Sequence, residues 1–178
     1  SFTTGVSAQN LIDSLNAELS KSTTLIDKFN IHKKIYGLSN KFERDSIFTI
    51  ISGLDFPSKN DSLNGSFNLL KGYNFSIKNE FDSAHIYYDK SYTIFTKTNS
   101  VNDRLSVLDR ISFVFSVKNE IEKKDSINQI MLSLIDDKEV TDSNKCNVYS
   151  TVAKTYSRMG ELANALDYFL KAEAYLDT

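Results

Sequence analysis

Residue types that commonly carry out catalysis are few and scattered in this chain of 178 residues. There are two histidines, His32 and His85, and one cysteine, Cys146. A nucleophilic cysteine needs a base beside it, and a structural or catalytic metal needs several ligands together. The sequence also has no glycine-rich phosphate-binding motif. We therefore predict that the chain is not an enzyme and that it has no catalytic residues, no metal ligands and no cofactor.

The charged side chains most suited to binding a partner are Lys154 and Arg158. Four residues apart on a helix, they share one face. Two cations there could hold a carboxylate or an acidic segment, although most exposed pairs of this kind are only solvated surface charge. The segment around Tyr73, Tyr87 and Tyr88 is rich in aromatic residues, and we interpret most of these as packing, with Tyr73 as the best candidate for an exposed anchor.

Composition limits the classes of function. The formal net charge is −2 and charges of both signs are spread along the chain, which predicts that this region binds no nucleic acid. It has no apolar run long enough to cross a bilayer, so we expect no membrane insertion here. Hydrophobic residues make up 40% of the chain, with Pro57 as the single proline, which favours a packed core built from long helices.

Apolar residues recur at helical spacing along nearly the whole chain, as in Leu11, Leu15 and Leu19. The β-branched and aromatic segment 112–117 resembles a strand, but its flanks keep the helical period, and we predict a helix there. Polar breaks at 55–66, 96–103 and 136–144 supply capping residues. The expected helices, about nine in number, lie near 9–20, 23–38, 42–54, 62–79, 81–96, 101–118, 122–135, 142–159 and 161–176.

The first eight residues are treated apart from the predicted domain at 9–178. Val6-Ser7-Ala8 has small residues where a signal peptidase reads them, which would make Gln9 the new N-terminus. Residues 1–8 are interpreted either as the remnant of a secretory signal or as a disordered polar lead-in. The first interpretation predicts an exported, periplasmic protein, and the second a cytoplasmic one.

A motif near the C-terminus combines small and aromatic residues at fixed spacing. Its members, in order, are Tyr149, Val152-Ala153, Tyr156, Gly160, Ala165, Phe169 and Ala172. Small residues let two antiparallel helices approach closely, bulky ones fill the gaps between helices and repeats, and glycine permits the turn. This motif resembles the tetratricopeptide repeat, although the proline usual at its end is absent.

A second copy of the motif reads Gly72, Phe75, Ala84, Tyr88 and Ser91, with Asn79 in place of the turn glycine because asparagine tolerates a left-handed backbone. Two fainter copies carry Asp-Ser-Ile at 45–47 and at 125–127. Counted between Ile47, Ala84, Ile127 and Ala165, the copies recur at intervals of 37, 43 and 38 residues. The standard repeat has about 34 residues, so these repeats are lengthened. We place them near 24–56, 62–98, 101–136 and 142–178.

The resemblance implies an all-α fold, a right-handed α-α superhelix (TPR-like solenoid) of about four helical hairpins plus an N-terminal helix. The alternative is a generic helical bundle. Repeat proteins of this family bind partners on a concave face lined by the first helix of each pair. Mapped onto the repeats, the implied partner-binding residues are Asn147, Ser150, Lys154, Arg158, Leu69, Tyr73, Ile77, His32 and Tyr36.

The leading hypothesis is a scaffold or sensor module that binds a protein or peptide through this face. Its resemblance to degenerate, lengthened repeats suggests the extracytoplasmic part of a larger envelope or signalling protein. The rival hypothesis is a groove-binding carrier for a small molecule or glycan, although the chain lacks the tryptophan common in such sites. The final repeat shows no polar capping helix, which predicts either a fragment of a longer protein or an end covered by a partner, for example by self-association.

Overall fold

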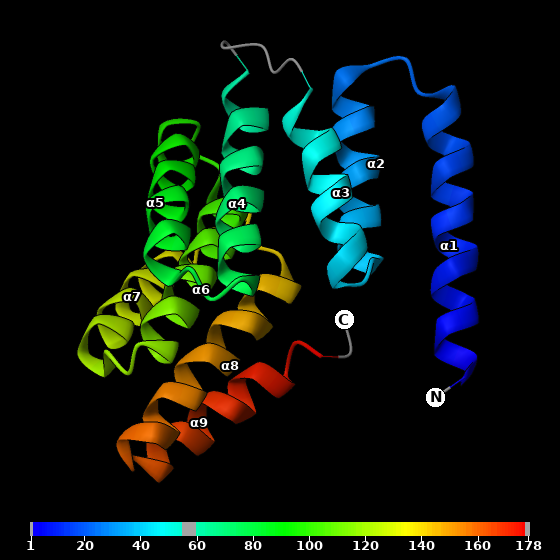
Figure 1. The fold of residues 1–178 in the computed structure, drawn as a ribbon. Coiled ribbons are helices and arrows are strands. Elements are labelled where there is room, and N and C mark those ends of the chain that lie inside the picture. Colours follow the sequence, from blue (N-terminus) through cyan, green and yellow to red (C-terminus); the bar gives the residue numbers. More distant parts are fainter. Residues whose placement is uncertain (1, 55–59, 177–178) are drawn as a thin grey trace. The chain divides into compact units, whose positions relative to one another are not determined.

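The computed structural model describes residues 2–54 and 60–176, and every regular element in those ranges is an α-helix (Figure 1). The all-α fold is therefore confirmed. In chain order the helices are α1 (Phe2–Lys21), α2 (Leu25–Leu38), α3 (Lys41–Ser52), α4 (Asp61–Ile77), α5 (Phe81–Lys97), α6 (Val101–Val117), α7 (Ile121–Leu134), α8 (Asp142–Met159) and α9 (Leu162–Glu173).

The helix boundaries follow the sequence prediction closely, with one exception. Helix α1 begins at Phe2, seven residues before the predicted start at residue 9. The side chains of residues 1–8 lie outside the described part. The strand-like segment 112–117 belongs to α6, as expected. No helix in the described ranges combines the length and the apolar content needed to span a bilayer.

The chain divides into two compact units, residues 1–63 and 64–178. The first unit holds α1, α2 and α3 around Leu15, Ile31 and Ile35. Thr24 caps α2 by accepting a hydrogen bond from the Asp27 backbone N–H at 3.1 Å. A reciprocal pair of bonds joins Asn40 and Glu43 at the start of α3, each 3.1 Å long, which satisfies backbone groups that the helix leaves unpaired.

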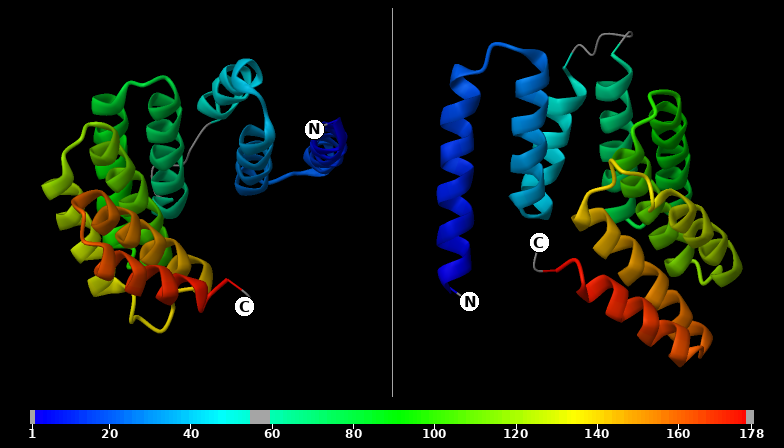
Figure 2. Two further views of the ribbon diagram at one scale, coloured as in Figure 1. Left: turned by 90° about the horizontal axis from the view of Figure 1, so that it is seen from below. Right: turned by 180° about the vertical axis from the view of Figure 1, so that it is seen from behind.

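The second unit is a stack of three helical hairpins, α4/α5, α6/α7 and α8/α9 (Figure 2). Consecutive helices pack together from α5 to α9, and α6 also packs on α8. Because α6 contacts α8, these first helices of successive hairpins are neighbours, as in a solenoid. Helix α4 approaches α5 closely at Gly65, whose carbonyl accepts a hydrogen bond of 2.8 Å from the Ser91 hydroxyl.

The turn inside each hairpin has the same backbone design. Asn79 (φ 63°), Asn119 (φ 58°) and Gly160 (φ 82°) adopt the left-handed conformation, as predicted for Asn79. The next residue is always glutamate, and its N–H reaches back five residues: Glu80 to the Phe75 carbonyl, Glu120 to Phe115 and Glu161 to Tyr156, at 3.0, 2.9 and 2.9 Å. These are Schellman closures, and they recur at intervals of 40 and 41 residues.

This interval corrects the predicted spacing of 43 and 38 residues. Counted from the turn, the positions of Ala84 and Ala165 correspond to Lys124, not to Ile127. All three are buried, with 0%, 3% and 5% of their surface exposed respectively. The Asp-Ser pairs at 82–83 and 125–126 are exposed or half-buried, so packing constrains their register less than that of the buried positions.

The core of the α4/α5 hairpin is built around Tyr88. The ring is fully buried beside Gly72, and burial raises the pKa of its phenol to about 12, so the side chain stays neutral. Phe169 occupies the corresponding position in α9 but is 43% exposed. The prediction that Phe169 fills a gap between helices is therefore wrong, because no helix of the described ranges packs over that side of α9.

Candidate partner-binding face

Three parallel first helices, α4, α6 and α8, form one continuous face of the second unit. The Arg110 guanidinium on α6 lies 5.9 Å from the ring centre of Tyr73 on α4. On the other side, the Thr151 hydroxyl of α8 donates to the Asp109 carboxylate of α6 at 2.9 Å. We call this surface the first-helix face. It comprises Leu69, Tyr73 and Ile77; Asp109, Arg110, Phe113 and Val117; and Asn147, Ser150, Lys154 and Arg158.

The α4 residues predicted from the sequence lie on this face. Leu69, Tyr73 and Ile77 are each half-buried, and Leu69 also packs against the α5/α6 core. The Arg110 guanidinium lies over the Tyr73 ring, so this part of the face combines an aromatic surface with a positive charge.

The α6 residues of the face were missed by the sequence prediction. Phe113 and Val117 each expose 48% of their surface, although both are large and apolar. They stand 40 residues after Tyr73 and Ile77, so they occupy the same repeat positions. The signal that could have located them is Lys-Asn-Glu, which occurs at 78–80 and again at 118–120.

The α8 residues are available to different degrees. Asn147 and Lys154 are exposed and Ser150 is half-buried. The Arg158 guanidinium donates to the carbonyl and the hydroxyl of Ser116 and to the Asn119 Oδ1, with the carbonyl contact at 3.2 Å. Arg158 therefore holds α8 against the C-terminal end of α6, and Lys154 is the member of the predicted pair that remains available to a ligand.

A third cation, Lys124 of α7, adds to the charge at this end of the face. Its side chain is only 5% exposed and makes no hydrogen bond or ion pair within the described residues. Burial lowers the pKa of its ammonium, and the positive charges of Arg158 and Lys154 lower it further, whereas Asp109 acts in the opposite direction. Lys124, Lys154 and Arg158 therefore concentrate positive charge between α7 and α8.

A chain of hydrogen bonds beneath the face connects α6, α7 and α8. The Ser112 hydroxyl donates to the Asn128 Oδ1 at 3.4 Å, and the Asn128 amide donates to the Thr155 hydroxyl at 2.8 Å. Thr155 in turn donates to the Thr151 carbonyl at 3.0 Å. Ser112, Asn128 and Thr155 are fully buried, so this network orients α8 relative to α6 and keeps the face rigid.

Two solved structures resemble this arrangement of helices. The crystal structure of BtubC (BKLC) from P. vanneervenii matches with a TM-score of 0.67 at 12% sequence identity, over 96% of this chain and 71% of that one. The crystal structure of a Podosopora anserina putative kinesin light chain with nearly identical TPR-like repeats matches with a TM-score of 0.58 at 8% identity, over 98% of this chain and 89% of that one. The chain has a TPR-like repeat fold. No family model and no curated protein matches its sequence significantly.

The TPR-like fold places two of the predicted binding residues inside the first unit. Tyr36 and His32 expose only 2% and 9% of their surface. The Tyr36 ring lies beside Phe48 and under the Arg44 guanidinium, and the His32 Nδ1 is 2.7 Å from the Lys28 carbonyl. The prediction that His32 and Tyr36 line a binding face is corrected, because their side chains point into the packing of the hairpin.

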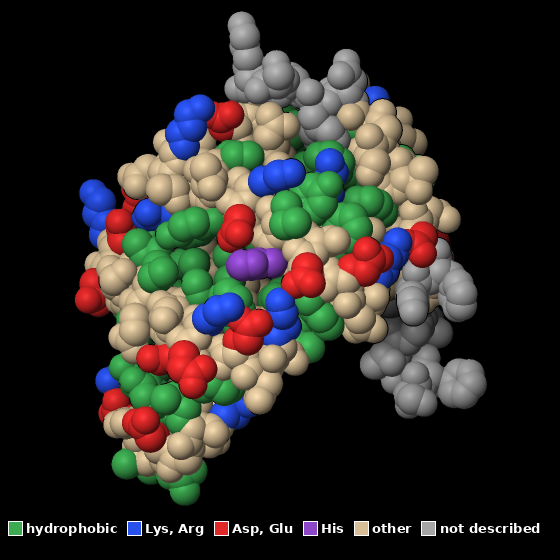
Figure 3. All heavy atoms as spheres, turned by 60° about the vertical axis from the view of Figure 1, so that its left-hand side comes forward, with side chains coloured by type: hydrophobic (Ala, Val, Ile, Leu, Met, Phe, Trp, Pro, Cys, Tyr) green, Lys and Arg blue, Asp and Glu red, His purple; other side chains and the backbone are tan. Residues whose placement is uncertain are grey.

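The side chains considered for catalysis are dispersed in this fold. His85 lies 3.6 Å from Asp89 and its ring packs edge-on against Phe115, while Cys146 is half-buried on α8. Among the described residues, no three His, Cys, Asp or Glu side chains gather closely enough to hold a metal. Figure 3 shows charges of both signs mixed with apolar side chains over one side of the molecule.

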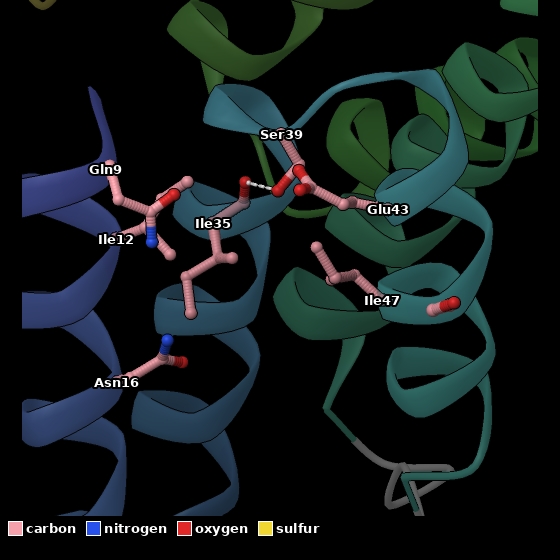
Figure 4. Close-up of a pocket in the computed structure, with 8 residues that line it drawn as sticks. Gln9, Ile12, Asn16, Ile35, Ser39, Glu43 and Ile47 are labelled. Carbon is pink, nitrogen blue, oxygen red and sulfur yellow. Dashed lines mark hydrogen bonds between the residues drawn. The ribbon is translucent and has the colours of Figure 1, made fainter. Parts of the chain in front are cut away.

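The first unit contains an open pocket of about 310 Å³ between α1, α2 and α3 (Figure 4). Apolar side chains of Ile12, Ile35 and Ile47 form part of its wall, and the polar groups include Gln9, Asn16 and Glu43. This volume is at the lower end of the range for small-molecule sites.

Proposed function

We propose that the chain is a non-catalytic scaffold or sensor module that binds a protein or peptide partner through the first-helix face. The observation that carries the proposal is the exposure of Phe113 and Val117 at 48% each, between Tyr73 on one side and Lys154 on the other. Large apolar side chains grouped on a rigid surface are typical of protein interaction sites.

The chemistry of the face indicates the kind of segment that it would bind. The apolar centre at Phe113 and Val117 suits a hydrophobic side chain, and Tyr73 with Arg110 adds a flat surface at one edge. The Lys154 ammonium, supported by Lys124, suits a carboxylate at the other edge. The proposed ligand is therefore a peptide segment with an apolar side chain near an acidic group.

The proposal is tested by selecting binders from a displayed library of random peptides. Peptides selected on the wild-type chain are expected to combine apolar and acidic residues. Phe113→Glu and Lys154→Glu should each weaken the binding of selected peptides by at least about tenfold, because an apolar contact or a charge pair is lost. Ile130→Glu, at an exposed apolar position on α7, is the matched control and should bind normally. Equal binding by Phe113→Glu and the wild type would refute the proposal.

The pocket of the first unit supports a second candidate function, a carrier for a small molecule or glycan. A thermal-shift screen of sugars and small metabolites would reveal it as a rise in melting temperature. Ile12→Trp, which fills the pocket, should abolish that rise, whereas Phe113→Glu should leave it unchanged. A screen without a stabilising compound would leave the peptide-binding function favoured.

Export of the protein, as part of a signalling or envelope assembly, is a proposal that rests on Val6-Ser7-Ala8 alone. N-terminal sequencing of the full-length protein from its native host is the measurement that decides it. A mature protein that begins at Gln9 in the periplasmic fraction would support export. A protein that keeps the residues before Gln9 and stays in the cytoplasm would contradict it.

A further inference from the structure

Helix α9 carries an apolar face that no described helix covers. Leu162, Leu166, Phe169, Leu170 and Leu176 lie along this side of α9 and the turn that follows it, and they expose between 43% and 69% of their surface. The adjoining side of the helix packs on α8 through Ala165 and Ala172, which are buried. Exposed apolar surface of this extent on a small protein marks an interaction site.

The repeat shows what kind of element belongs on this face. Phe169 stands at the position of Tyr88 in α5 and of Asn128 in α7, counted from the turn, and both of those residues are fully buried. Leu176 stands at the position of Phe95 in α5, which is also fully buried. In the first two hairpins of the unit, therefore, the second helix is covered at the position of Phe169, and in the first hairpin also at that of Leu176.

In both cases the cover is the first helix of the next hairpin. Helix α6 packs on α5 with Val107, Ile111 and Val114, which form one cluster with Tyr88 and Phe95. Helix α8 packs on α7 with Val148, Val152 and Thr155, at the same positions 41 residues later. The covering helix thus presents three β-branched residues at positions i, i+4 and i+7. This spacing places them on one side of the helix.

We propose that the exposed face of α9 binds an amphipathic helix from a partner protein, seated as α6 is seated on α5. The partner helix presents β-branched residues at positions i, i+4 and i+7. In a second copy of this chain the matching sides of α6 and α8 are already buried, so neither of these helices is available as the cover. Glu173 lies between Phe169 and Leu176 on the same side, which favours a Lys or Arg beside the apolar stripe of the partner.

The test uses a helix-stapled, fluorescent peptide with the sequence of residues 142–159, which carries the stripe of Val148, Val152 and Thr155. Fluorescence anisotropy is expected to show saturable binding to the 178-residue chain. Phe169→Glu and Leu166→Glu, two independent changes at exposed positions, should each weaken binding by at least about tenfold. Ile130→Glu is the matched control on α7, and replacing the stripe of the peptide by serine should remove binding.

Several outcomes would overturn this proposal. They are the absence of saturable binding by the wild type, binding that Phe169→Glu and Leu166→Glu leave unchanged, and dimerisation in sedimentation velocity that Phe169→Glu abolishes. The last result would assign the face to a second copy of the chain. Circular dichroism confirms that each variant is folded. Phe113→Glu should still bind the helical peptide, because Phe113 lies on the first-helix face and not on α9. The assay therefore tests the α9 face separately from the first-helix face.

Discussion

At the scale of single residues, Lys124 departs most clearly from the repeat. Its position is held by alanine in the neighbouring hairpins, at Ala84 and Ala165, and it is buried in all three. A partly desolvated ammonium is costly, because burial of the side chain reduces the solvation of its charge. The cost is increased by the positive charges of Arg158 and Lys154. The charge of Lys124 therefore lowers the stability of the native state.

Replacing Lys124 by methionine should stabilise the chain by about 1 kcal/mol at pH 7, because a similar volume is filled without a buried charge. The native pKa of Lys124 lies below the ordinary value of 10.5, so the native state loses this proton before the unfolded state does. The cost is thus fully present at low and neutral pH and is relieved as the pH rises towards 10.5.

Urea denaturation at pH 7 and pH 10 measures this effect. The advantage of Lys124→Met over the wild type should shrink at the higher pH. Lys138→Met, at an exposed lysine, is the control and should change the free energy of unfolding little at either pH. A destabilised Lys124→Met variant would show that the ammonium makes a favourable interaction in the native state.

At the scale of elements, the close approach of α4 and α5 depends on glycine. A Cβ added at Gly72 would fall on the ring of Tyr88 and 3.1 Å from the Ala84 carbonyl oxygen. Neither group can move easily, because Tyr88 is fully buried and the carbonyl belongs to the helix backbone. The small residue at this position therefore decides how tightly the hairpin closes.

Gly72→Ala should lower the free energy of unfolding by about 2–3 kcal/mol, because the added methyl group overpacks the hairpin. Gly37→Ala in α2 is a matched control: nothing lies within 4 Å of the added Cβ, and the gain in helix propensity should stabilise by about 0.5–1 kcal/mol. Chemical denaturation of both variants measures the difference. Equal effects of the two substitutions would contradict the close packing of Gly72 against Tyr88.

At the scale of the whole molecule, each unit has a core of its own. The first unit packs around Leu15, Ile31 and Ile35, and the second around two clusters shared by successive hairpins. In a repeat protein, stability comes from each repeat and from the interfaces between neighbours. The three stacked hairpins of the second unit therefore form a domain with two internal interfaces.

A fragment of residues 60–178 should accordingly fold by itself, with a helical circular dichroism spectrum and a cooperative thermal transition. A fragment of residues 100–178 keeps only two hairpins and loses the α5/α6 interface, so it should melt at a lower temperature or without cooperativity. Melting curves of both fragments measure this. Non-cooperative melting of the longer fragment would show that the second unit depends on the first.

Much of the fold could be predicted because its determinants are local. Apolar residues at helical spacing located the helices, and the motif from Tyr149 to Ala172 identified the TPR-like hairpin. Asn79 was correctly assigned to the turn because few residues adopt its backbone conformation readily. These features depend on neighbours within one helix or one turn, which the order of residues displays directly.

The candidate site was predicted less well. Lys154, Tyr73 and Ile77 lie on the first-helix face, but His32 and Tyr36 are buried and Phe113 and Val117 were overlooked. The middle hairpin was placed three residues out of register because it carries Ser112, Lys124 and Asn128 at the positions of Gly72, Ala84 and Tyr88, so the motif is not recognisable there. Ser112, Asn128 and Thr155 compensate through hydrogen bonds, which sequence similarity does not reveal.

The sequence by itself determined that the chain is helical, that its helices pair as TPR-like hairpins and where most of them begin and end, because these properties arise from local spacing, capping and turn geometry. Only the tertiary structure decided which apolar side chains remain outside. Phe113, Val117 and Phe169 are no less hydrophobic than the buried residues of the core. Their exposure depends on whether another helix packs over them, and that is set by the stacking of hairpins far apart in the sequence.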